Sequence, residues 1–166
     1  MENTVFINLQ DQIFSGNILD IGKDNYGVIY NLFKYLNNDG DINYVEKNEK
    51  CSIECEQYDN CVLFFSLSTM ANVFEREQIL EEAYKYLKRD GILYIWDIEK
   101  KKGKTYEKNI KVYMPDKSLK KINIKDGNLL KISSIDRTIS LLSKKFEVLY
   151  SRVGNEIYHI TCRKRR

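Results

Sequence analysis

Apolar positions along the chain fall into short continuous runs and into longer stretches with helical spacing. Residues 18–21 form one such run, and its last part together with the next residue reads Asp20-Ile21-Gly22. In residues 28–36 the apolar positions repeat every three to four residues. This succession predicts a strand, a tight turn and a helix. Glycine at the turn allows a close backbone approach, and the helix that follows offers unpaired N–H groups, so the segment is suited to hold a nucleotide-like ligand.

The pattern continues as alternating strands and helices. Residues 42–45 predict a brief second strand with Glu46 at its end, and the continuous apolar run 61–65 predicts a strand buried on both faces, next to the first strand. Ser68 or Thr69 is expected to begin a helix that ends at residues 88–91. Residues 92–98 predict another buried strand, and this alternation favours a parallel sheet with right-handed crossovers.

Two segments fit this alternation less well. The first ten residues are mixed polar and apolar and are interpreted as a lead before the first strand. Between Glu46 and Tyr58 the chain is polar and carries cysteines, and its eleven residues are too few for a crossover helix and another full parallel strand.

The last third of the chain changes character. Residues 100–132 carry short, partly alternating pieces at 110–114, 119–124 and 129–132, which predict an inserted hairpin or loop region. A helix is expected at residues 134–143, with Ser133 and Asp136 resembling a capping box. Residues 146–153 and 156–163, joined by Gly154-Asn155, predict an antiparallel hairpin that closes the sheet.

The length of 166 residues favours a single domain, 1–166, around one core. No run approaches the roughly 18 apolar residues of a membrane span, so a cytoplasmic protein without a membrane partner is expected. Four cysteines are expected to be reduced thiols, because a chain of this size needs no disulfides; they are Cys51, Cys55, Cys61 and Cys162. The spacing of the first three fits no common zinc pattern, and no histidine is near them. No metal site is therefore predicted.

The net charge of +3 conceals an uneven distribution. Residues 1–98 carry a net charge of −9, and residues 99–166 carry +12. The split is compatible with an anionic ligand or nucleic acid bound by the later half, with attraction between subunits of a homo-oligomer, or with attraction between the two halves of one chain. Charge runs are usually solvated faces, and the predominance of lysine over arginine favours that interpretation.

Several motifs in order resemble those of class I S-adenosylmethionine-dependent methyltransferases. They are the strand ending in Asp20-Ile21-Gly22, the central strand introduced by Tyr58-Asp59, the "Leu-Lys-x-x-Gly" sequence at residues 87–91, and the closing hairpin. The resemblance runs from about residue 17 to residue 163. It implies an α/β fold of the Rossmann-like three-layer sandwich type, with a mostly parallel seven-stranded sheet whose last strand is antiparallel, here shortened around the second and third strands.

The resemblance also implies S-adenosylmethionine as cofactor and assigns site residues. Asp20 and Gly22 match the family's residues at the end of the first strand, near the methionine end of the cofactor. Glu46 is similar in position to the acidic residue that binds the ribose hydroxyls, where a carboxylate accepts two hydrogen bonds. The residues after the central strand would face the reacting methyl group; they are Phe65, Ser66 and Leu67.

The same comparison shows departures from the family pattern. Where the family loop carries further glycines, this sequence has Asp24 and Tyr26, which add a negative charge and bulk at the expected cofactor carboxylate. The short segment between Glu46 and Tyr58 leaves little chain for the wall that normally covers the adenine.

Two hypotheses of different class follow. The first is a methyltransferase whose substrate, a small molecule or an anion, lies over Ser68 and the basic residues Lys100, Lys101 and Lys102. The second is a methyltransferase-like module without catalysis, which binds a partner, nucleic acid included, through the basic half. No catalytic base is identified, because positioning supplies most of the rate of methyl transfer. His159, the only histidine, and Cys162 are interpreted as structural residues.

Overall fold

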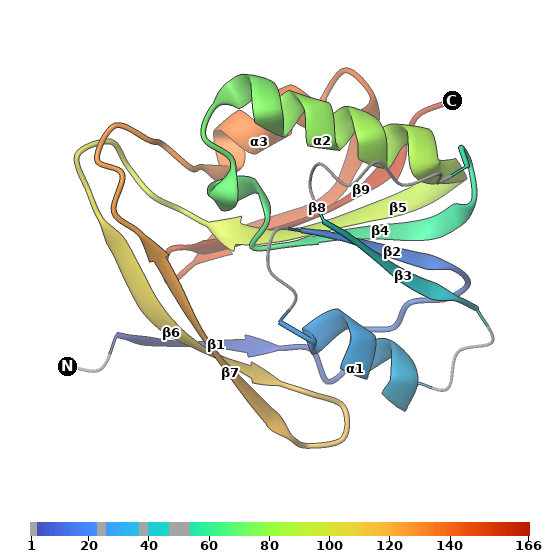
Figure 1. The fold of residues 1–166 in the computed structure, drawn as a ribbon, viewed down its shortest axis with the longest axis horizontal. Coiled ribbons are helices and arrows are strands. Elements are labelled where there is room, and N and C mark those ends of the chain that lie inside the picture. The colour runs from blue at the N-terminus through green and yellow to red at the C-terminus, as the bar shows by residue number, and fades with distance from the viewer. Residues whose placement is uncertain (1–2, 23–25, 37–39, 47–53) are drawn as a thin grey trace.

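The computed structural model describes residues 3–22, 26–36, 40–46 and 54–166. Its described strands form two sheets (Figure 1). The large sheet has six strands in the order β3-β2-β4-β5-β9-β8. These strands are β2 (Ile18–Gly22), β3 (Ile42–Glu46), β4 (Tyr58–Phe64), β5 (Leu87–Ile98), β8 (Phe146–Gly154) and β9 (Ile157–Lys164).

The large sheet is parallel at one side and antiparallel at the other. β3, β2, β4 and β5 pair in parallel, whereas β9 runs antiparallel to both of its neighbours, β5 and β8. The prediction of a mostly parallel sheet with an antiparallel closing hairpin is therefore confirmed. The resemblance implied seven strands, but the described residues form six in this sheet.

The inserted region forms a second, three-stranded sheet. β6 (Tyr106–Tyr113) and β7 (Leu119–Asp126) make an antiparallel hairpin, and β1 (Thr4–Asn8) pairs in parallel with β6. The hairpin was predicted, but the segment at residues 129–132 is not a strand. The interpretation of residues 1–10 as a lead was wrong for β1, because its pairing partner lies about a hundred residues away and leaves no local signal.

The two faces of the large sheet have different covers (Figure 1). The helices α2 (Val73–Tyr86) and α3 (Ile135–Leu142) lie on one face, and α1 (Val28–Tyr35) lies on the other, next to the small sheet. Two buried apolar clusters match these covers: one joins the sheet to α2 and α3, and the other joins it to α1, β1 and β6. Burial of these clusters is the main stabilising contribution to the fold.

Several element boundaries differ from the predicted ones, each for a local reason. α2 begins after Asn72, whose side chain accepts a hydrogen bond from the backbone N–H of Glu75, so the expected start at Ser68 or Thr69 was wrong. A short 3-10 helix, η1 (Leu67–Thr69), lies there instead. α3 is capped by Ser134 through the N–H of Arg137, which replaces the predicted cap at Ser133.

The turn of the closing hairpin is shifted by one residue. Asn155 and Glu156 both have positive φ, at 52° and 59°, which is the backbone of a type I′ hairpin turn. The predicted turn Gly154-Asn155 was therefore off by one, since Gly154 belongs to β8.

Residues of the resemblance motifs meet at the end of the sheet opposite the carboxyl ends of β2 and β4. Lys88 Nζ lies 3.0 Å from both carboxylate oxygens of Asp59, and Asp59 accepts a hydrogen bond from the N–H of Asn17. These contacts join the start of β2 to β4, and β4 to β5, at one end of the sheet. The other end of β2 lies at the site described below.

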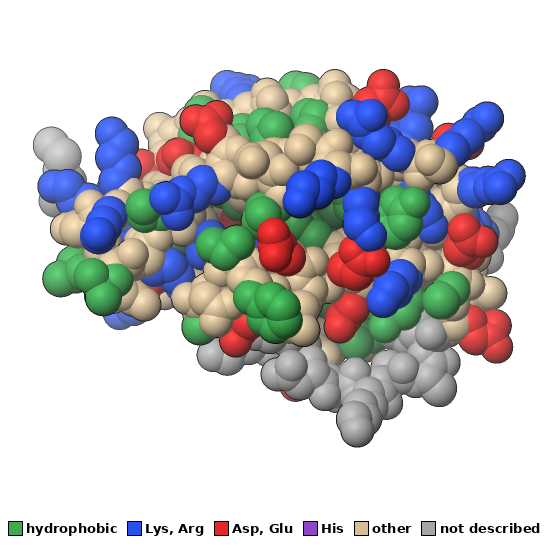
Figure 2. Space-filling view, turned by 90° about the horizontal axis from the view of Figure 1, so that it is seen from above, with side chains coloured by type: hydrophobic (Ala, Val, Ile, Leu, Met, Phe, Trp, Pro, Cys, Tyr) green, Lys and Arg blue, Asp and Glu red, His purple; other side chains and the backbone are tan. Residues whose placement is uncertain are grey.

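The acidic and basic halves of the sequence are interleaved in the fold. Ion pairs join them at Lys145 and Glu81, at Lys164 and Glu56, and at Arg166 and Asp90. Figure 2 shows the face that carries α2 and α3, where Lys and Arg side chains lie among Asp and Glu side chains. Attraction between the halves of one chain accounts for part of the charge split.

Candidate functional site

The carboxyl ends of three parallel strands lie side by side and bring together most of the predicted cofactor residues. Gly22 at the end of β2 is directly opposite Glu46 at the end of β3, and β4 flanks β2 on the other side. β2 is therefore inside the sheet and not at its margin. Ligands of open α/β sheets bind at this edge, beyond the carboxyl ends of the strands.

Asp20 lies beneath the start of α1 with very little space beside it. The cavity that it lines has a volume of about 10 Å³ and is closed by Tyr26, Val28, Ile29 and Phe64. Burial raises the pKa of Asp20 to about 7. Within the described residues its carboxylate has no hydrogen-bond or ion-pair partner, so ionisation at this position is costly. A half-buried carboxylate with no partner among the described residues is a candidate functional group.

Glu46 and Gly22 lie at the open side of the strand ends. The Glu46 side chain is exposed, and the carbonyl of Gly22 accepts a hydrogen bond of 3.2 Å from the hydroxyl of Tyr44. Gly27 precedes α1 with a φ of 70°, a left-handed conformation that favours glycine. Asp24, which was predicted to oppose the cofactor carboxylate, lies outside the described residues, as do residues 47–53, where the adenine wall was expected to be missing.

The segment after β4 turns sharply at the same edge. Phe65 has a φ of 53°, unusual for a bulky residue, and its N–H donates a 2.7 Å hydrogen bond to the carbonyl of Trp96. The hydroxyl of Ser66 donates to the carbonyl of Ile21 at 2.7 Å, which ties this turn to β2. Leu67 packs in the core below α2. Phe65 and Ser66 therefore lie at the strand ends, whereas the side chain of Leu67 points away from them.

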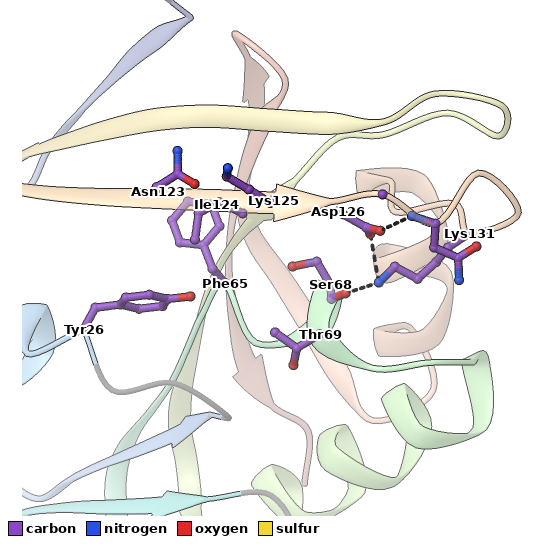
Figure 3. A pocket seen from close by; sticks show the side chains of 11 residues that line it. Tyr26, Phe65, Ser68, Thr69, Asn123, Ile124, Lys125, Asp126 and Lys131 are labelled. Carbon is purple, nitrogen blue, oxygen red and sulfur yellow. Dashed lines mark hydrogen bonds and ion pairs between the residues drawn. The ribbon is translucent and has the colours of Figure 1, made fainter.

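A second, larger cavity of about 560 Å³ opens beside this turn, between β4 and the small sheet (Figure 3). It is lined by Phe65, Ser68, Thr69, residues 123–128, Lys131 and Tyr26. Its volume lies in the range that small-molecule sites occupy. The prediction had included Phe65 and Ser68 but missed the whole wall from β7, because nothing in the sequence shows which face of the inserted hairpin meets the large sheet.

Tyr26 is the side chain that the two cavities share. It lines both the small cavity at Asp20 and the large one, and its ring meets Phe64 edge-on with a centroid distance of 6.3 Å. Figure 3 shows the ring between the start of α1 and Phe65. In this conformation Tyr26 separates Asp20 from the larger cavity, as its bulk had suggested.

A compact ion cluster forms the far wall of the large cavity. Lys131 Nζ lies 2.8 Å from Asp126 Oδ2 and also donates to the carbonyl of Ser68 (Figure 3). Behind them, Lys100 Nζ lies 3.5 Å from Asp126 Oδ1. Burial opposes ionisation of Asp126, but the hydrogen bonds from Lys131 and Asn128 and the charges of Lys131 and Lys100 hold its pKa below the usual value. The cluster therefore stays charged and fixes the wall.

The basic residues predicted to bind substrate are not brought to this cavity. Lys100 is buried behind Asp126, and its ammonium donates at 2.5 Å to the carbonyl of Asn128. Lys101 and Lys102 are exposed and do not line the cavity. Lys100 thus supports the wall from behind, and the cavity's own lysines are Lys125 and Lys131.

A buried carboxylate fixes the position of Ser68, which lines the large cavity. Asp97 at the end of β5 is fully buried and accepts hydrogen bonds from the N–H groups of Ser68 and Ile98. Burial raises its pKa, while the bonds from Ser68 and Ile98 and the charge of Arg76 act in the opposite direction. Arg76 in turn donates to the carbonyl of Ile132. Ser68 is thereby held on both sides, by Asp97 and by Lys131.

The remaining candidate residues that the structure describes line neither of these two cavities. His159 stacks on Trp96 with a centroid distance of 4.2 Å, and burial lowers its pKa to about 4, so it is neutral at pH 7. Cys61 and Cys162 are buried free thiols, Cys55 is an exposed one, and Cys51 lies outside the described residues. Among the described residues no group of three or more metal-binding side chains is found, and no helix is long and apolar enough to cross a membrane.

Comparison by sequence finds nothing: no protein family and no curated protein matches this chain. Comparison by structure finds many matches. A SAM-dependent methyltransferase from Methanosarcina mazei has a TM-score of 0.58 at 16% identity and covers 94% of this chain and 96% of that one. One from Mesorhizobium loti has a TM-score of 0.63 at 10% identity, with 94% and 95% covered.

A third match is a 1,6-didemethyltoxoflavin-N1-methyltransferase from Burkholderia thailandensis, solved with 1,6-didemethyltoxoflavin and S-adenosylhomocysteine bound. It has a TM-score of 0.61 at 14% identity and covers 92% of this chain and 72% of that one. The chain therefore has the fold of class I S-adenosylmethionine-dependent methyltransferases.

Proposed function

We propose that the protein is an S-adenosylmethionine-dependent methyltransferase that binds its cofactor at the carboxyl ends of β2, β3 and β4. The observation that carries the proposal is Asp20, a half-buried carboxylate without a partner among the described residues, at the strand edge where the resemblance expects the cofactor. An ionised Asp20 without a partner lowers the stability of the folded protein. Its presence is explained if the carboxylate contacts a positively charged group of the bound ligand.

The donor set at this edge fits the cofactor chemically. Asp20 and Gly22 would hold the methionine end, and the exposed carboxylate of Glu46 would accept hydrogen bonds from the ribose hydroxyls. Phe65, Ser66 and the backbone of Leu67 would lie at the reacting methyl group. When bound, S-adenosylmethionine supplies an electrophilic methyl group on a sulfonium.

The space at this edge does not admit the cofactor while Tyr26 stays in place. The cavity beside Asp20 has room for about one water molecule, and the ring of Tyr26 closes it toward the larger cavity. Cofactor binding therefore requires the ring of Tyr26 to turn away from Phe64. This rotation joins the two cavities into one continuous crevice.

The large cavity would then hold the methyl acceptor. Ser68 and Thr69 offer hydroxyl groups on one side, and Asn123, Lys125 and Lys131 offer donors on the other. The chain's own contribution is positioning and exclusion of water, because methyl transfer to a nucleophile held in line needs no dedicated base. Both lysines are paired, Lys131 with Asp126 and Lys125 with Glu107, so the lining favours a small polar acceptor without selecting its charge.

The closed cavity at Asp20 also supports a second candidate, a methyltransferase-like module that has lost its cofactor. In that case Tyr26 would fill the former site permanently. The two candidates differ in one measurable property, which is affinity for S-adenosylmethionine and S-adenosylhomocysteine.

The experiment is isothermal titration calorimetry with both compounds on the wild type, on Asp20→Asn and on Asp11→Asn, an exposed control of the same chemistry. We expect binding to the wild type and the control and a loss of at least about tenfold for Asp20→Asn, equivalent to about 1.4 kcal/mol. Binding at 100-fold excess over the dissociation constant should also stabilise the wild type by about 2.7 kcal/mol. Absence of binding at millimolar concentration would favour the non-catalytic module.

A further inference from the structure

The small sheet leaves one edge of β1 open. β1 pairs only with β6 among the described strands, and the bonds from the N–H of Leu9 to Tyr113 and from the N–H of Asn109 to Asn3 place the odd-numbered residues on the β6 side. In a parallel ladder alternate residues direct both backbone groups to the same side. The N–H and C=O groups of Thr4, Phe6 and Asn8 therefore face away from β6.

This edge lacks the protection that other sheet edges of the chain carry. β7 has Lys120, Lys121 and Lys125, and β8 has Glu147, Arg152 and a bulge between Val148 and Tyr150. Charges and bulges of this kind discourage pairing with another chain. β1 has the sequence Thr-Val-Phe-Ile-Asn, without charge, proline or bulge, and Phe6 is 54% exposed.

The open edge borders a groove of about 360 Å³ whose other wall is the β8–β9 hairpin. Aromatic side chains of β5, β8 and β9 line the groove opposite β1: His159 stacks on Trp96 at a centroid distance of 4.2 Å and meets Tyr150 at a tilt, at 5.4 Å. Arg152 lines the same groove, and it has no ion-pair partner among the described residues. The groove thus combines free backbone groups, an apolar wall and one positive charge.

From this arrangement we infer that the groove binds an extended peptide segment that adds a strand to β1. Backbone groups of Thr4, Phe6 and Asn8 form hydrogen bonds with the peptide backbone. Every second side chain of the peptide is apolar and lies against the aromatic wall, and an acidic side chain on the other face of the peptide pairs with Arg152. Arg152 favours an acidic peptide over self-association through β1, because the β1 strand of a second copy carries no acidic residue.

The chain carries its own reporter for this site, because Trp96 is its only tryptophan and lines the groove. The probe is the acetylated and amidated peptide Asp-Val-Asp-Phe-Asp-Val-Asp, titrated while the emission of Trp96 is recorded. Two versions are N-methylated at every second residue, one at the odd and one at the even positions. Because alternate residues of a strand direct their N–H groups to opposite sides, only one version should lose binding.

Variants of the groove test the assignment from the protein side. Phe6→Pro removes an N–H that faces the open edge and leaves the β1–β6 bonds intact. We therefore expect the probe to bind at least tenfold more weakly, with little change in the melting temperature of the protein. Arg152→Glu should weaken binding of the acidic probe and strengthen binding of a version of the peptide with lysine in place of aspartate. Lys144→Glu, an exposed control on the side of α3, should behave as the wild type.

The outcomes decide the proposal even if Phe6→Pro does not fold, because the paired methylated peptides and Arg152→Glu are independent of it. Equal binding of both methylated versions, or no change in Trp96 emission at millimolar probe, would overturn it. A concentration-dependent sedimentation coefficient that is abolished by Phe6→Pro, without probe binding, would assign the edge to a second copy and would overturn it as well.

Discussion

The burial of Asp20 predicts a specific dependence of stability on pH. Its pKa rises from 3.8 to about 7 in the folded protein because the carboxylate is removed from water without a partner among the described residues. A shift of about three pKa units corresponds to a ceiling of about 4 kcal/mol, at about 1.36 kcal/mol per unit, and structural relaxation reduces this figure. Asn at this position keeps the shape of the side chain and removes the titration.

The sign follows from proton linkage. The folded state holds the proton more tightly than the unfolded state, so the stability that protonation of Asp20 provides is fully present below about pH 4 and is lost as pH rises through 7. Wild type and Asp20→Asn share all other titrating groups. The difference between them should therefore grow by about 2–3 kcal/mol from pH 5 to pH 8, with the variant more stable at pH 8.

The assay is urea unfolding at pH 5, 6, 7 and 8, followed by circular dichroism, with Asp11→Asn as the control. We expect the control to follow the wild type at every pH. Parallel stability profiles for the wild type and Asp20→Asn would refute the claim that desolvation raises the pKa of Asp20. Loss of stability in Asp20→Asn at pH 8 would show instead that the carboxylate makes a favourable contact in the folded state.

Three further variants test other parts of the account. Tyr26→Ala should join the two cavities and raise the affinity for S-adenosylhomocysteine in calorimetry; unchanged or weaker binding would contradict the role of the ring as a barrier. Lys131→Met removes one of the two ammonium groups at the buried Asp126, and we expect a loss of about 3 kcal/mol in urea unfolding, against less than 0.5 kcal/mol for the exposed Lys101→Met. Asn72→Ala should cost about 1 kcal/mol in thermal unfolding through loss of the cap of α2, and a cost near zero would show that Glu75 alone is sufficient.

Elements with a local signal were predictable from the sequence. The continuous apolar run before Phe65 is typical of a strand buried on both faces, and β4 is such a strand. The reduced sheet predicted from the short segment after Glu46 stays a prediction, because residues 47–53 lie outside the described residues. Asp20, Gly22 and Glu46 lie in the carboxyl-terminal parts of β2 and β3, so parallel pairing of these strands was enough to bring them to one edge.

Features that depend on distant parts of the chain were not predictable in this way. β1 is recognisable only through its pairing with β6, and the cavity wall from Asn123 to Asn128 depends on which face of the inserted hairpin meets the large sheet. Lys100 belongs to a visible basic cluster, yet its burial against Asp126 changes it from a candidate ligand into a wall support. The positions of charged residues in the sequence do not show which lysine will form an ion pair with a buried carboxylate.

The most direct test of the central claim is a crystal structure of the protein with S-adenosylhomocysteine. We predict that the ligand lies across the carboxyl ends of β2, β3 and β4, with Asp20 and Glu46 in contact with it and the ring of Tyr26 turned away from Phe64. A ligand bound elsewhere, or a Tyr26 ring that still closes the cavity at Asp20 in a saturated complex, would contradict the account.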